Sequence, residues 1–434
     1  MGIVLYEIRD PIHRTILVGE DERPVLDDPW VQRLRHIRQL GFVSLVYPGG
    51  AHDRFQHSLG VMHLAGTRFA TLSQHPLMAA ACTEAERAWC QRVVRLAGLL
   101  HDVGHPPFSH TAEVFLPPVE ALRLPADWYR EGRIPAHRRA THEDATLAIV
   151  ADLAARGVLD PELARDVAAV LSADVRRSPR LSRLGSMVGI LRALVSGELD
   201  SDRGDYLLRD SHHLGVSYGV YDLPRLCASE CIVKGPEGPE LGLDVHGVHA
   251  FEGLLMARYH LFMQVYFHKT PPAFEHYLER AVAEGEVPLS IQVLGDLLDL
   301  HDGTILDRIA RGARALLPWS RRIHGRVPAK LVLRERVGAE TAENWISQSL
   351  IAELRAAGCT VFERRSRQRF TAIGDGARLL CERRVLGRPR IESVTRHSDL
   401  LARFNAPIDL RHTYVLREDE SKARAIMDRM DVGL

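Results

Sequence analysis

The sequence predicts a mainly α-helical protein with a small β-hairpin and a C-terminal α+β lobe. Apolar residues recur at helical spacing through long stretches before about residue 315. Residues 228–245 run from apolar through a Gly- and Pro-containing turn to apolar again, which is typical of a hairpin. From about residue 330, strand-like runs such as KLVLRERV alternate with helical segments. Because 434 residues exceed one ordinary core, we expect a main domain at 1–326, including an N-terminal arm, and the lobe at 327–434.

Local signals place the elements in order. Residues 1–20 predict a short β-ribbon or extended arm, because β-branched runs flank the turn signal Asp10-Pro11. Asp27-Asp28-Pro29 predicts a helix start, since aspartate caps helices well and proline fits the first helical turn. Surface loops are expected at 49–54 and at the proline-rich stretch 114–140. Helices are expected at about 30–40, 55–72, 84–104, 143–155, 161–171, 191–214 and 340–357.

Composition excludes several classes of protein. Hydrophobic residues make up 46% and charged residues 26%, which is normal for a soluble globular enzyme. The formal net charge is zero, so no basic field favours long nucleic acid, and we expect no nucleic-acid partner. No apolar run reaches the roughly 18 residues of a membrane span, and the N-terminus lacks a signal-peptide pattern. Six scattered cysteines without a CxxC pair fit a reducing cytosol, so we expect a cytoplasmic protein.

The run HDVGHPPFSH carries the strongest chemical signal. It places three histidines and an aspartate within ten residues after an apolar helix, which packing alone explains poorly. His101-Asp102 is an adjacent pair of potential ligands, while His57 lies upstream and Asp202 downstream. Two imidazoles and two carboxylates suit one borderline divalent metal, such as Mn, Fe, Ni, Co or Zn. Gly104 and the following prolines should end the helix and open a cavity at its C-terminus.

Several ordered blocks resemble a known family. DPIH, VQRLRHIRQLG, RFQHSLGV, HDVGHPPFSH, THED, SDRGDYLLRDSHHLG and VYFHK resemble the HD-domain deoxynucleoside triphosphate triphosphohydrolases, especially the SAM-and-HD-domain enzyme and its bacterial relatives. The resemblance covers about residues 5–320 and implies an HD-domain helical core. It also implies hydrolysis of a dNTP to deoxynucleoside and triphosphate, with Mg²⁺ bound to the triphosphate. The choice of scissile bond comes from the family, because spacing cannot show it.

The resemblance also implies roles for individual residues. His57, His101, Asp102 and Asp202 look like the metal ligands. His105 matches a histidine proposed as general acid at the leaving group, and His142 matches one that completes the site. Glu113 stands where the family has an aspartate. The carboxylate is retained, but its side chain is one methylene longer, which affects its hydrogen-bond geometry with His105.

Other positions match substrate contacts in the same family. Phosphate-binding residues correspond to Arg54, Arg203 and Arg258, and residues near the sugar correspond to Gln39, Leu40, Tyr206, Asp210 and Tyr266. Arg203 replaces a lysine of the eukaryotic enzyme, which keeps the charge and changes the geometry. Tyr266 would crowd a 2′-hydroxyl, which is the basis for expecting deoxynucleotides as substrates.

In the same family a nucleotide binds between subunits and orders a tetramer. Asp27, Gln32 and Arg35 match residues that read guanine there, and His268 and Lys269 match phosphate contacts. We therefore expect a homo-oligomer, dimer or tetramer, with a possible nucleotide activator. The alternative is that residues 27–35 are an ordinary capped helix start with salt bridges. Arg9 replaces an asparagine of the eukaryotic pattern, and the C-terminal lobe matches nothing in it.

Two other functions remain open from the sequence. The chain could be another HD phosphoesterase, acting on nucleoside monophosphates, cyclic nucleotides or nucleic acid ends. It could also be a non-catalytic nucleotide sensor or oligomeric scaffold, although a sensor does not need an intact set of metal ligands. The products formed from a panel of nucleotides would separate the three hypotheses.

Overall fold

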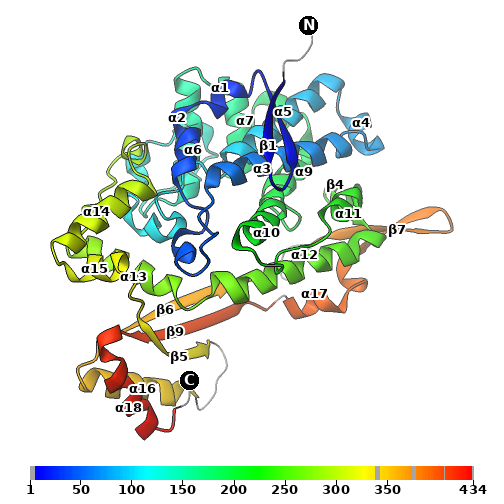
Figure 1. Cartoon of the computed structure of the whole chain (residues 1–434). Helices are drawn as coiled ribbons and strands as arrows, with labels where there is room; N and C mark the ends of the chain where they lie inside the picture. The colour runs from blue at the N-terminus through cyan, green and yellow to red at the C-terminus, as the bar shows by residue number, and fades with distance from the viewer. Residues whose placement is uncertain (1–4, 338–342, 374–377, 405, 433–434) are drawn as a thin grey trace.

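The computed structural model describes residues 5–337, 343–373, 378–404 and 406–432. It is mainly helical, as the sequence predicts. Its longer helices are α3 (Arg54–Leu72), α5 (Glu84–Leu100), α6 (His142–Ala155), α7 (Pro161–Leu171), α9 (Val188–Val195), α10 (Ser201–Leu214), α12 (Val248–Leu261), α13 (Pro271–Ala283), α14 (Asp302–Arg314), α16 (Glu343–Ala356) and α18 (Glu420–Arg429). Shorter ones are α1 (Arg23–Leu26), α2 (Pro29–Gln32), α4 (Pro76–Ala81), α8 (Pro179–Ser182), α11 (Leu223–Ala228), α15 (Pro318–His324) and α17 (Asp399–Phe404). Figure 1 shows the C-terminal strands β5 (Lys330–Arg336), β6 (Val361–Gln368) and β9 (Ile408–Val415) lying beneath α12 and α13. Among the described residues, no helix combines the length and the apolar character needed to span a bilayer.

The predicted β-ribbon at the N-terminus is confirmed. Strand β1 (Leu5–Asp10) pairs antiparallel with β2 (Arg14–Gly19). Asp10 closes the turn, because its carboxylate accepts hydrogen bonds from the backbone N–H groups of Ile12 and His13 at 2.9 and 2.8 Å. The turn thereby directs the His13 side chain into the helical body.

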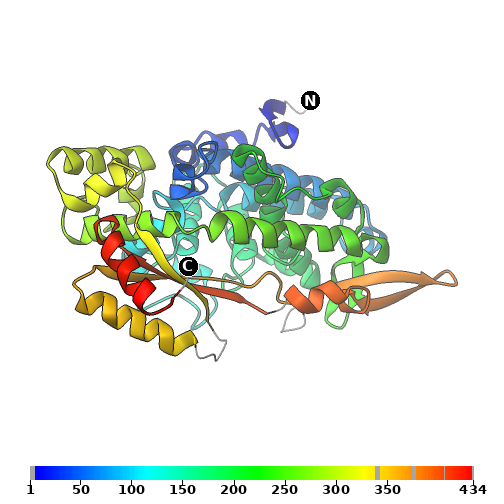
Figure 2. The same ribbon diagram turned by 60° about the horizontal axis from the view of Figure 1, so that its bottom comes forward.

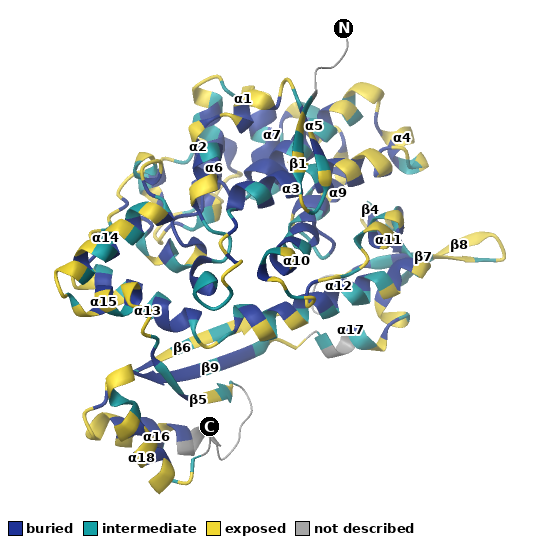
Figure 3. Cartoon of the chain, in the orientation of Figure 1, coloured by how far each residue is buried: buried dark blue, intermediate teal, exposed yellow. Residues whose placement is uncertain are grey.

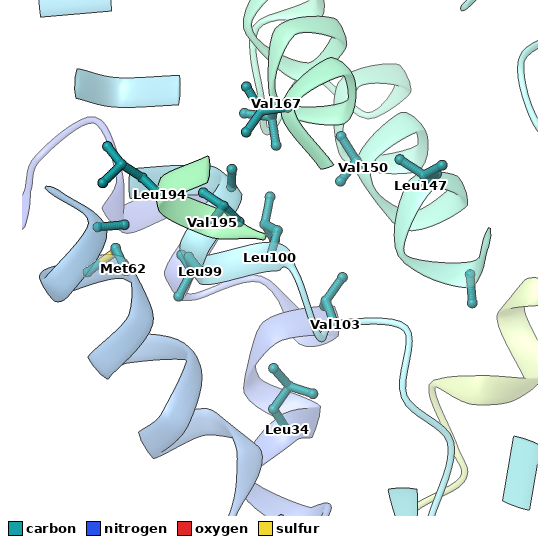
Figure 4. Packing of buried hydrophobic residues seen from close by; sticks show 14 of the residues in the cluster. Leu34, Met62, Leu99, Leu100, Val103, Leu147, Val150, Val167, Leu194 and Val195 are labelled. Carbon is teal, nitrogen blue, oxygen red and sulfur yellow. The ribbon is translucent and has the colours of Figure 1, made fainter. Parts of the chain in front are cut away.

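The core is built around the long helices α3 and α5. Asp53 caps α3 by accepting from the backbone N–H of Gln56, and a capping box of Thr83 and Glu86 starts α5. Figure 4 shows side chains of α3, α5 and α9 meeting around Leu99 and Leu100. Burying each such leucine contributes roughly 1.5–3 kcal/mol. This packing holds the end of α5 in place, and His101 is the residue that follows it.

Three helix predictions were wrong in extent. The helix expected at 30–40 is α2 followed by the short 3-10 helix η1 (Arg33–His36). Beyond it the chain is extended and pairs with the segment before α3: Arg54 N–H donates to Ile37 O at 2.9 Å, and Gln39 N–H donates to His52 O at 3.0 Å. This long-range pairing replaces the local helical bonds. The helix expected to reach residue 104 ends at Leu100, and residues 101–104 form turns.

The third wrong prediction joined two helices into one. Residues 191–214 hold the end of α9 and all of α10, which are separated at 196–200. The carboxylate of Asp200 accepts from the backbone N–H of Arg203 at 2.8 Å and of Gly197 at 3.1 Å, so it caps a new helix. This break turns the first residues of α10 toward the end of α5.

The stretch 114–140, expected to be a surface loop, is partly packed into the core. It contains the 3-10 helices η4 (Val119–Leu122) and η5 (Ala126–Trp128). A third 3-10 helix, η3 (Ser109–Phe115), ends within the start of this stretch. Leu122 and Trp128 are buried. The predicted capped helix start at 27–29 is confirmed, with Asp28 as the capping residue.

The strands of the second half form two sheets. The predicted hairpin is β3 (Glu230–Gly235) with β4 (Gly238–Asp244), and its sheet order is β3-β4-β7-β8. Strands β7 (Leu380–Val385) and β8 (Arg388–Ser393) therefore extend a hairpin of the main body. The other sheet has the order β5-β9-β6, with bounds Lys330–Arg336, Ile408–Val415 and Val361–Gln368. Figure 3 shows its central strand β9 as largely buried.

The C-terminal part mixes helices and strands, as expected for an α+β lobe. It contacts the body through β6, where Phe362 stacks on His276 of α13 with ring centroids 3.8 Å apart. Figure 2 shows α16 and α18 at the outer side of this sheet. The helix expected at 340–357 is α16, and its first expected residues, 340–342, lie outside the described part. The domain boundary after residue 326 stays a prediction.

Candidate functional site

A cavity of about 470 Å³ lies between the start of α3, the end of α5, α10 and the π-helix η8 (Phe262–Tyr266). The predicted site residues that line it are Gln39, Leu40, Arg54, Asp102, His105, His142, Asp202, Tyr206, Asp210, Arg258 and Tyr266. A smaller cavity of about 290 Å³ also touches Asp102 and Asp202, and His101 lines it. Asp102 and Asp202 therefore lie in the wall between two cavities, and His101 borders the smaller one.

The four predicted ligands converge, although they come from three distant segments. His57 lies on α3, His101 and Asp102 follow α5, and Asp202 lies in the first turn of α10. Potential ligand atoms of His57, His101 and Asp202 lie within 4.8 Å of one another. The Asp102 Oδ2 atom lies 3.5 Å from His101 Nε2 and 3.8 Å from His57 Nε2. The structure thus brings the four side chains together, and their role as metal ligands stays a prediction.

Hydrogen bonds outside the cluster orient both imidazoles. His57 Nδ1 lies 2.8 Å from Asp205 Oδ2, and His101 Nδ1 lies 2.8 Å from the backbone oxygen of Gly98. Both acceptors favour a proton on Nδ1, which leaves the Nε2 lone pairs directed into the cluster. The Nε2 atom of His101 is buried and has no hydrogen-bond partner among the described residues. An unpartnered imidazole nitrogen beside two carboxylates fits a divalent cation.

The negative charges around His57 also fit a bound cation. Burial disfavours its protonated form, but hydrogen bonds to Asp202 and Asp205 outweigh burial and raise the pKa of His57 to about 10. The negative charge that attracts this proton would equally attract a metal ion, and the two compete for Nε2.

Asp205 is a site residue that sequence reasoning missed. It lies three residues after Asp202 on α10, and this spacing is the signal that could have found it. Besides His57, its carboxylate contacts His13 at 2.7 Å and Arg209 at 2.8 and 2.9 Å. Burial opposes its charge, but Arg209 and His13 hold the pKa of Asp205 well below its usual value. A Cβ atom on Gly60 would lie 1.9 Å from its Oδ1 atom, so only glycine fits there.

A second cluster lies beside the first. Potential ligand atoms of His105, His110, Glu113 and His142 also lie within 4.8 Å of one another. However, the rings of His105 and His142 are stacked, with centroids 3.9 Å apart and an interplanar angle of 14°. Lone pairs in nearly parallel, stacked rings do not converge on one point. This cluster therefore fits proton transfer better than metal binding.

The partner of Glu113 differs from the expectation. Its Oε1 atom lies 2.7 Å from His142 Nδ1 and 2.6 Å from His110 Nδ1, and neither contact involves His105. His110 stands three residues before Glu113, and sequence reasoning gave it no role. Burial opposes the charge of Glu113, but these histidines lower its pKa to about 2, so it is ionised near neutral pH.

His105 also contacts the first cluster, with its Nε2 atom 3.3 Å from Asp102 Oδ1. Burial and the neighbouring charges of Arg54 and His142 hold the pKa of His105 well below its usual value. His105 is therefore neutral near pH 7 in the free protein, which is not the state that a general acid needs.

Two of the three predicted phosphate-binding arginines reach the large cavity. Arg54 pairs with Asp102 and donates from Nε to Ser109 Oγ at 2.9 Å. Arg258 donates to the backbone oxygen of Phe370 at 2.7 Å, and its Nε has no partner among the described residues. Arg203 does not line this cavity: its guanidinium turns back to donate to Gly197 O at 2.7 Å. The loop that breaks the helix before α10 supplies that acceptor, so the prediction for Arg203 is not supported by its position.

Aromatic and acidic residues close the other end of the cavity. The hydroxyl of Tyr266 donates to Asp210 Oδ2 at 2.6 Å. Tyr206 presents its ring to Tyr266 with centroids 6.3 Å apart. Gln39 and Leu40 line the cavity, because the helix ends at His36, Ile37 is extended and residues 39–40 form a turn.

The predicted regulatory residues lie outside this cavity. Arg35 donates to Gln32 at 2.8 Å and covers the ring of Phe55, while exposed Asp27 pairs with Arg23. Lys269 lines a separate cavity of about 760 Å³, and His268 Nδ1 accepts from the backbone N–H of Thr270. Their regulatory role stays a prediction.

Known proteins resemble this chain in sequence and in fold. The family model described as HD domain matches residues 54–168. An uncharacterised protein of Methanocaldococcus jannaschii is 30% identical over 303 residues, which are 70% of this chain and 53% of that protein. The deoxynucleoside triphosphate triphosphohydrolase SAMHD1 homolog of Dictyostelium discoideum is 28% identical over 364 residues, 82% of this chain and 65% of that protein. The crystal structure of a hypothetical protein from Aquifex aeolicus superposes with a TM-score of 0.74 at 26% identity, covering 98% of this chain and 100% of that one.

The family match spans part of the site, and Asp202 lies beyond its end. The HD domain match begins at Arg54 and includes His57, His101, Asp102 and the second cluster. The chain spans a little more than half the length of the first curated relatives, at 53% and 54%. The chain is an HD-domain protein, related at about 30% identity to the SAMHD1-type deoxynucleoside triphosphate triphosphohydrolases.

Proposed function

We propose that this protein is a metal-dependent phosphohydrolase that converts a deoxynucleoside triphosphate into deoxynucleoside and triphosphate. The observation that carries the proposal is the convergence of His57, His101, Asp102 and Asp202. Asp102 and Asp202 of this cluster line a cavity that two arginines, Arg54 and Arg258, also line. Names of relatives such as the Dictyostelium protein support the choice of substrate.

The bound cation and the arginines would have different roles toward the phosphates. A divalent cation, once bound, supplies Lewis acidity toward a phosphate oxygen and favours a water nucleophile. Mn, Fe, Ni, Co and Zn all suit this donor set, and Mg²⁺ would accompany the triphosphate. Arg54 and Arg258 neutralise the polyphosphate charge. Arg54 would exchange its contact with Asp102 for a phosphate, which also frees Asp102 for the cation.

The second cluster provides the proton for the leaving oxygen. Glu113 is ionised and contacts both His110 and His142, so it stabilises an imidazolium at either ring. His110 and His142 both line the cavity. We therefore assign proton donation to this group and a positioning contact with Asp102 to the neutral His105.

Tyr266 and Asp210 recognise the sugar in this proposal. The Tyr266 hydroxyl is held by Asp210, so the ring cannot easily move aside for an additional substituent. A 2′-hydroxyl would meet this ring, which favours deoxynucleotides. The same proposal includes a homo-oligomer, with a nucleotide activator between subunits at Asp27, Gln32, Arg35, His268 and Lys269.

A product assay tests the proposal. The metal-loaded protein is incubated with four dNTPs, four NTPs, the corresponding monophosphates, cyclic nucleotides and a single-stranded oligonucleotide, and products are separated by ion-exchange chromatography. We expect deoxynucleoside and inorganic triphosphate in equal amounts. Release of pyrophosphate, or cleavage only of monophosphates, cyclic nucleotides or the oligonucleotide, would assign the protein to another class of phosphoesterase. Binding of dNTPs without turnover by fully metal-loaded protein would instead indicate a sensor.

A further inference from the structure

His52 is a buried histidine that the proposed reaction does not use. It lies in the segment between the 3-10 helix η2 (Gly41–Leu45) and α3, and its side chain is fully buried. Its Nε2 atom lies 2.8 Å from Asp210 Oδ1. The other oxygen of the same carboxylate accepts from the Tyr266 hydroxyl at 2.6 Å. Asp210 is therefore held from one side by His52 and from the other by Tyr266.

A second histidine supports His52 from behind. The ring of His213 stacks on that of His52 with centroids 4.4 Å apart and an interplanar angle of 7°. Burial, together with His52 and His212, lowers the pKa of His213 to about 4, so this ring is neutral near pH 7. The close stack needs Gly49, because a Cβ atom there would lie 1.9 Å from the backbone oxygen of His213.

The hydrogen bonds also indicate which nitrogen of His52 carries the proton. Its Nδ1 atom is buried and has no partner among the described residues, whereas Nε2 faces a carboxylate. A buried N–H without an acceptor is costly, so the proton belongs on Nε2 and is donated to Asp210. Each oxygen of Asp210 then receives one donor, and rotation of the carboxylate would break both hydrogen bonds.

We propose that His52 is a positioning residue that sets the preference for deoxyribose. By fixing Asp210, it fixes the Tyr266 hydroxyl and therefore the ring that a 2′-hydroxyl would meet. This inference rests on the proposed function for its substrate, but the positioning itself does not. Without the His52 donor, Asp210 can rotate away from Tyr266, the tyrosine ring gains freedom, and a ribonucleotide can be accommodated.

Two substitutions separate the hydrogen bond from the packing. His52→Phe keeps a ring against His213 and removes the donor to Asp210. His52→Gln restores a donor, because the amide nitrogen of glutamine reaches about as far as Nε2 of histidine. The matched control is His246→Phe, which removes a histidine–aspartate contact of 2.6 Å at the exposed surface. Bound metal and thermal unfolding are measured for all three variants, so that misfolding is recognised.

The structural arm of the test needs no substrate. Crystal structures should show the Tyr266–Asp210 hydrogen bond intact in His52→Gln and in His246→Phe, and broken or shifted in His52→Phe. If Asp210 and Tyr266 keep their positions in a folded His52→Phe protein, the positioning role is wrong, whatever the substrate is.

The kinetic arm compares kcat/KM for each dNTP with that for the matching NTP. We expect the ratio to fall about tenfold in His52→Phe, through better turnover of NTPs, and to recover in His52→Gln. The control should keep the wild-type ratio. An unchanged ratio in His52→Phe would overturn the role in sugar selection. If wild-type protein turns over no dNTP, the proposed function fails separately, and the structural arm alone decides the positioning of Asp210.

Discussion

The two histidine–carboxylate clusters lie side by side and share Asp102 as a neighbour, yet their geometry differs. In the first cluster, His57 and His101 use Nδ1 for contacts outside the cluster and keep Nε2 for its centre. In the second, Nδ1 of His110 and of His142 meet on one oxygen of Glu113. In the first cluster the Nε2 atoms therefore face the centre, where a cation could bind. In the second cluster the histidines are hydrogen-bonded to the carboxylate of the cluster itself.

The comparison shows that the function of a histidine in these clusters depends on which of its ring nitrogens is hydrogen-bonded to neighbouring residues. Asp205 and the backbone of Gly98 turn the first cluster into a set of converging acceptors, which suits a cation. Glu113 turns the second into a place where an imidazolium is stabilised, which suits proton transfer. The predictions below test this division, beginning with the largest expected effect.

Asp202→Ala should abolish both metal binding and turnover. It removes the carboxylate that lies 3.0 Å from His57 Nε2, and with it one of the four ligands and one of the two negative charges that would bind the cation. Bound metal by elemental analysis and the rate of dNTP hydrolysis should be measured on the same sample. Asp174→Ala is a matched control, because Asp174 lines the smaller cavity without belonging to the cluster. Full activity of the Asp202 variant would refute the ligand assignment.

Glu113→Gln should retain the metal and lose rate, by about 10²–10⁴-fold. The pKa of Glu113 is lowered to about 2, so wild-type protein carries this negative charge at every working pH, and the variant lacks it. An imidazolium at His110 or His142 then loses its carboxylate. The alkaline limb of the pH profile of kcat/KM should therefore move to lower pH. Loss of metal with an unchanged profile would move Glu113 into the metal cluster.

The acid stability of Glu113→Gln follows from the same pKa. Because folding lowers the pKa of Glu113 from 4.5 to about 2, its stabilising contribution is complete above pH 4.5 and disappears as the pH falls to about 2. Unfolding by urea between pH 5 and 3 should show a steeper loss of stability in wild-type protein than in the variant. Parallel curves would contradict the inferred charge.

Asp205→Asn should weaken metal binding by about 10–100-fold without abolishing it. The change weakens the contact that orients His57 but removes none of the four ligands. Asp10→Asn is the matched control, since Asp10 also pairs with Arg209, at 2.8 Å, and does not touch His57. Titration with Mn²⁺ gives the affinities. Equal affinities in the two variants would show that Asp205 acts only through Arg209.

Tyr266→Ala should relax discrimination against ribonucleotides, by about tenfold. The metal and both clusters are untouched, so kcat for dNTPs should change less than the dNTP-to-NTP ratio does. Steady-state kinetics with matched dNTP and NTP pairs measure the ratio. A ratio equal to that of the wild type would remove Tyr266 from sugar selection.

Local sequence patterns predicted what depends on neighbouring residues. The helix expected at 161–171 is α7, Pro161–Leu171, because the capping residue Asp160 directly precedes it and an apolar stripe lies along it. The candidate metal ligands were identified because histidines and aspartates rarely gather as they do in HDVGHPPFSH. The helix expected at 30–40 was wrong, since pairing with the residues just before α3 overrides its periodicity.

Contacts between residues that lie far apart in the chain could not be predicted from local sequence patterns. Asp205 gains its role from His13 and His57, which lie far away in the chain. Glu113 lies in one cluster with His105, but its hydrogen bonds go to His110 and His142. Arg203 was expected to contact the phosphates, but its guanidinium donates a hydrogen bond to the backbone oxygen of Gly197 in the loop before α10.

The central claim is that one cation binds among His57, His101, Asp102 and Asp202. Anomalous diffraction from crystals of Mn²⁺-loaded protein locates the ion directly. The account predicts a single strong peak at coordination distance from these four side chains, with no comparable peak at His110, Glu113 and His142. A peak only at the second cluster, or four side chains turned apart around solvent, would contradict it.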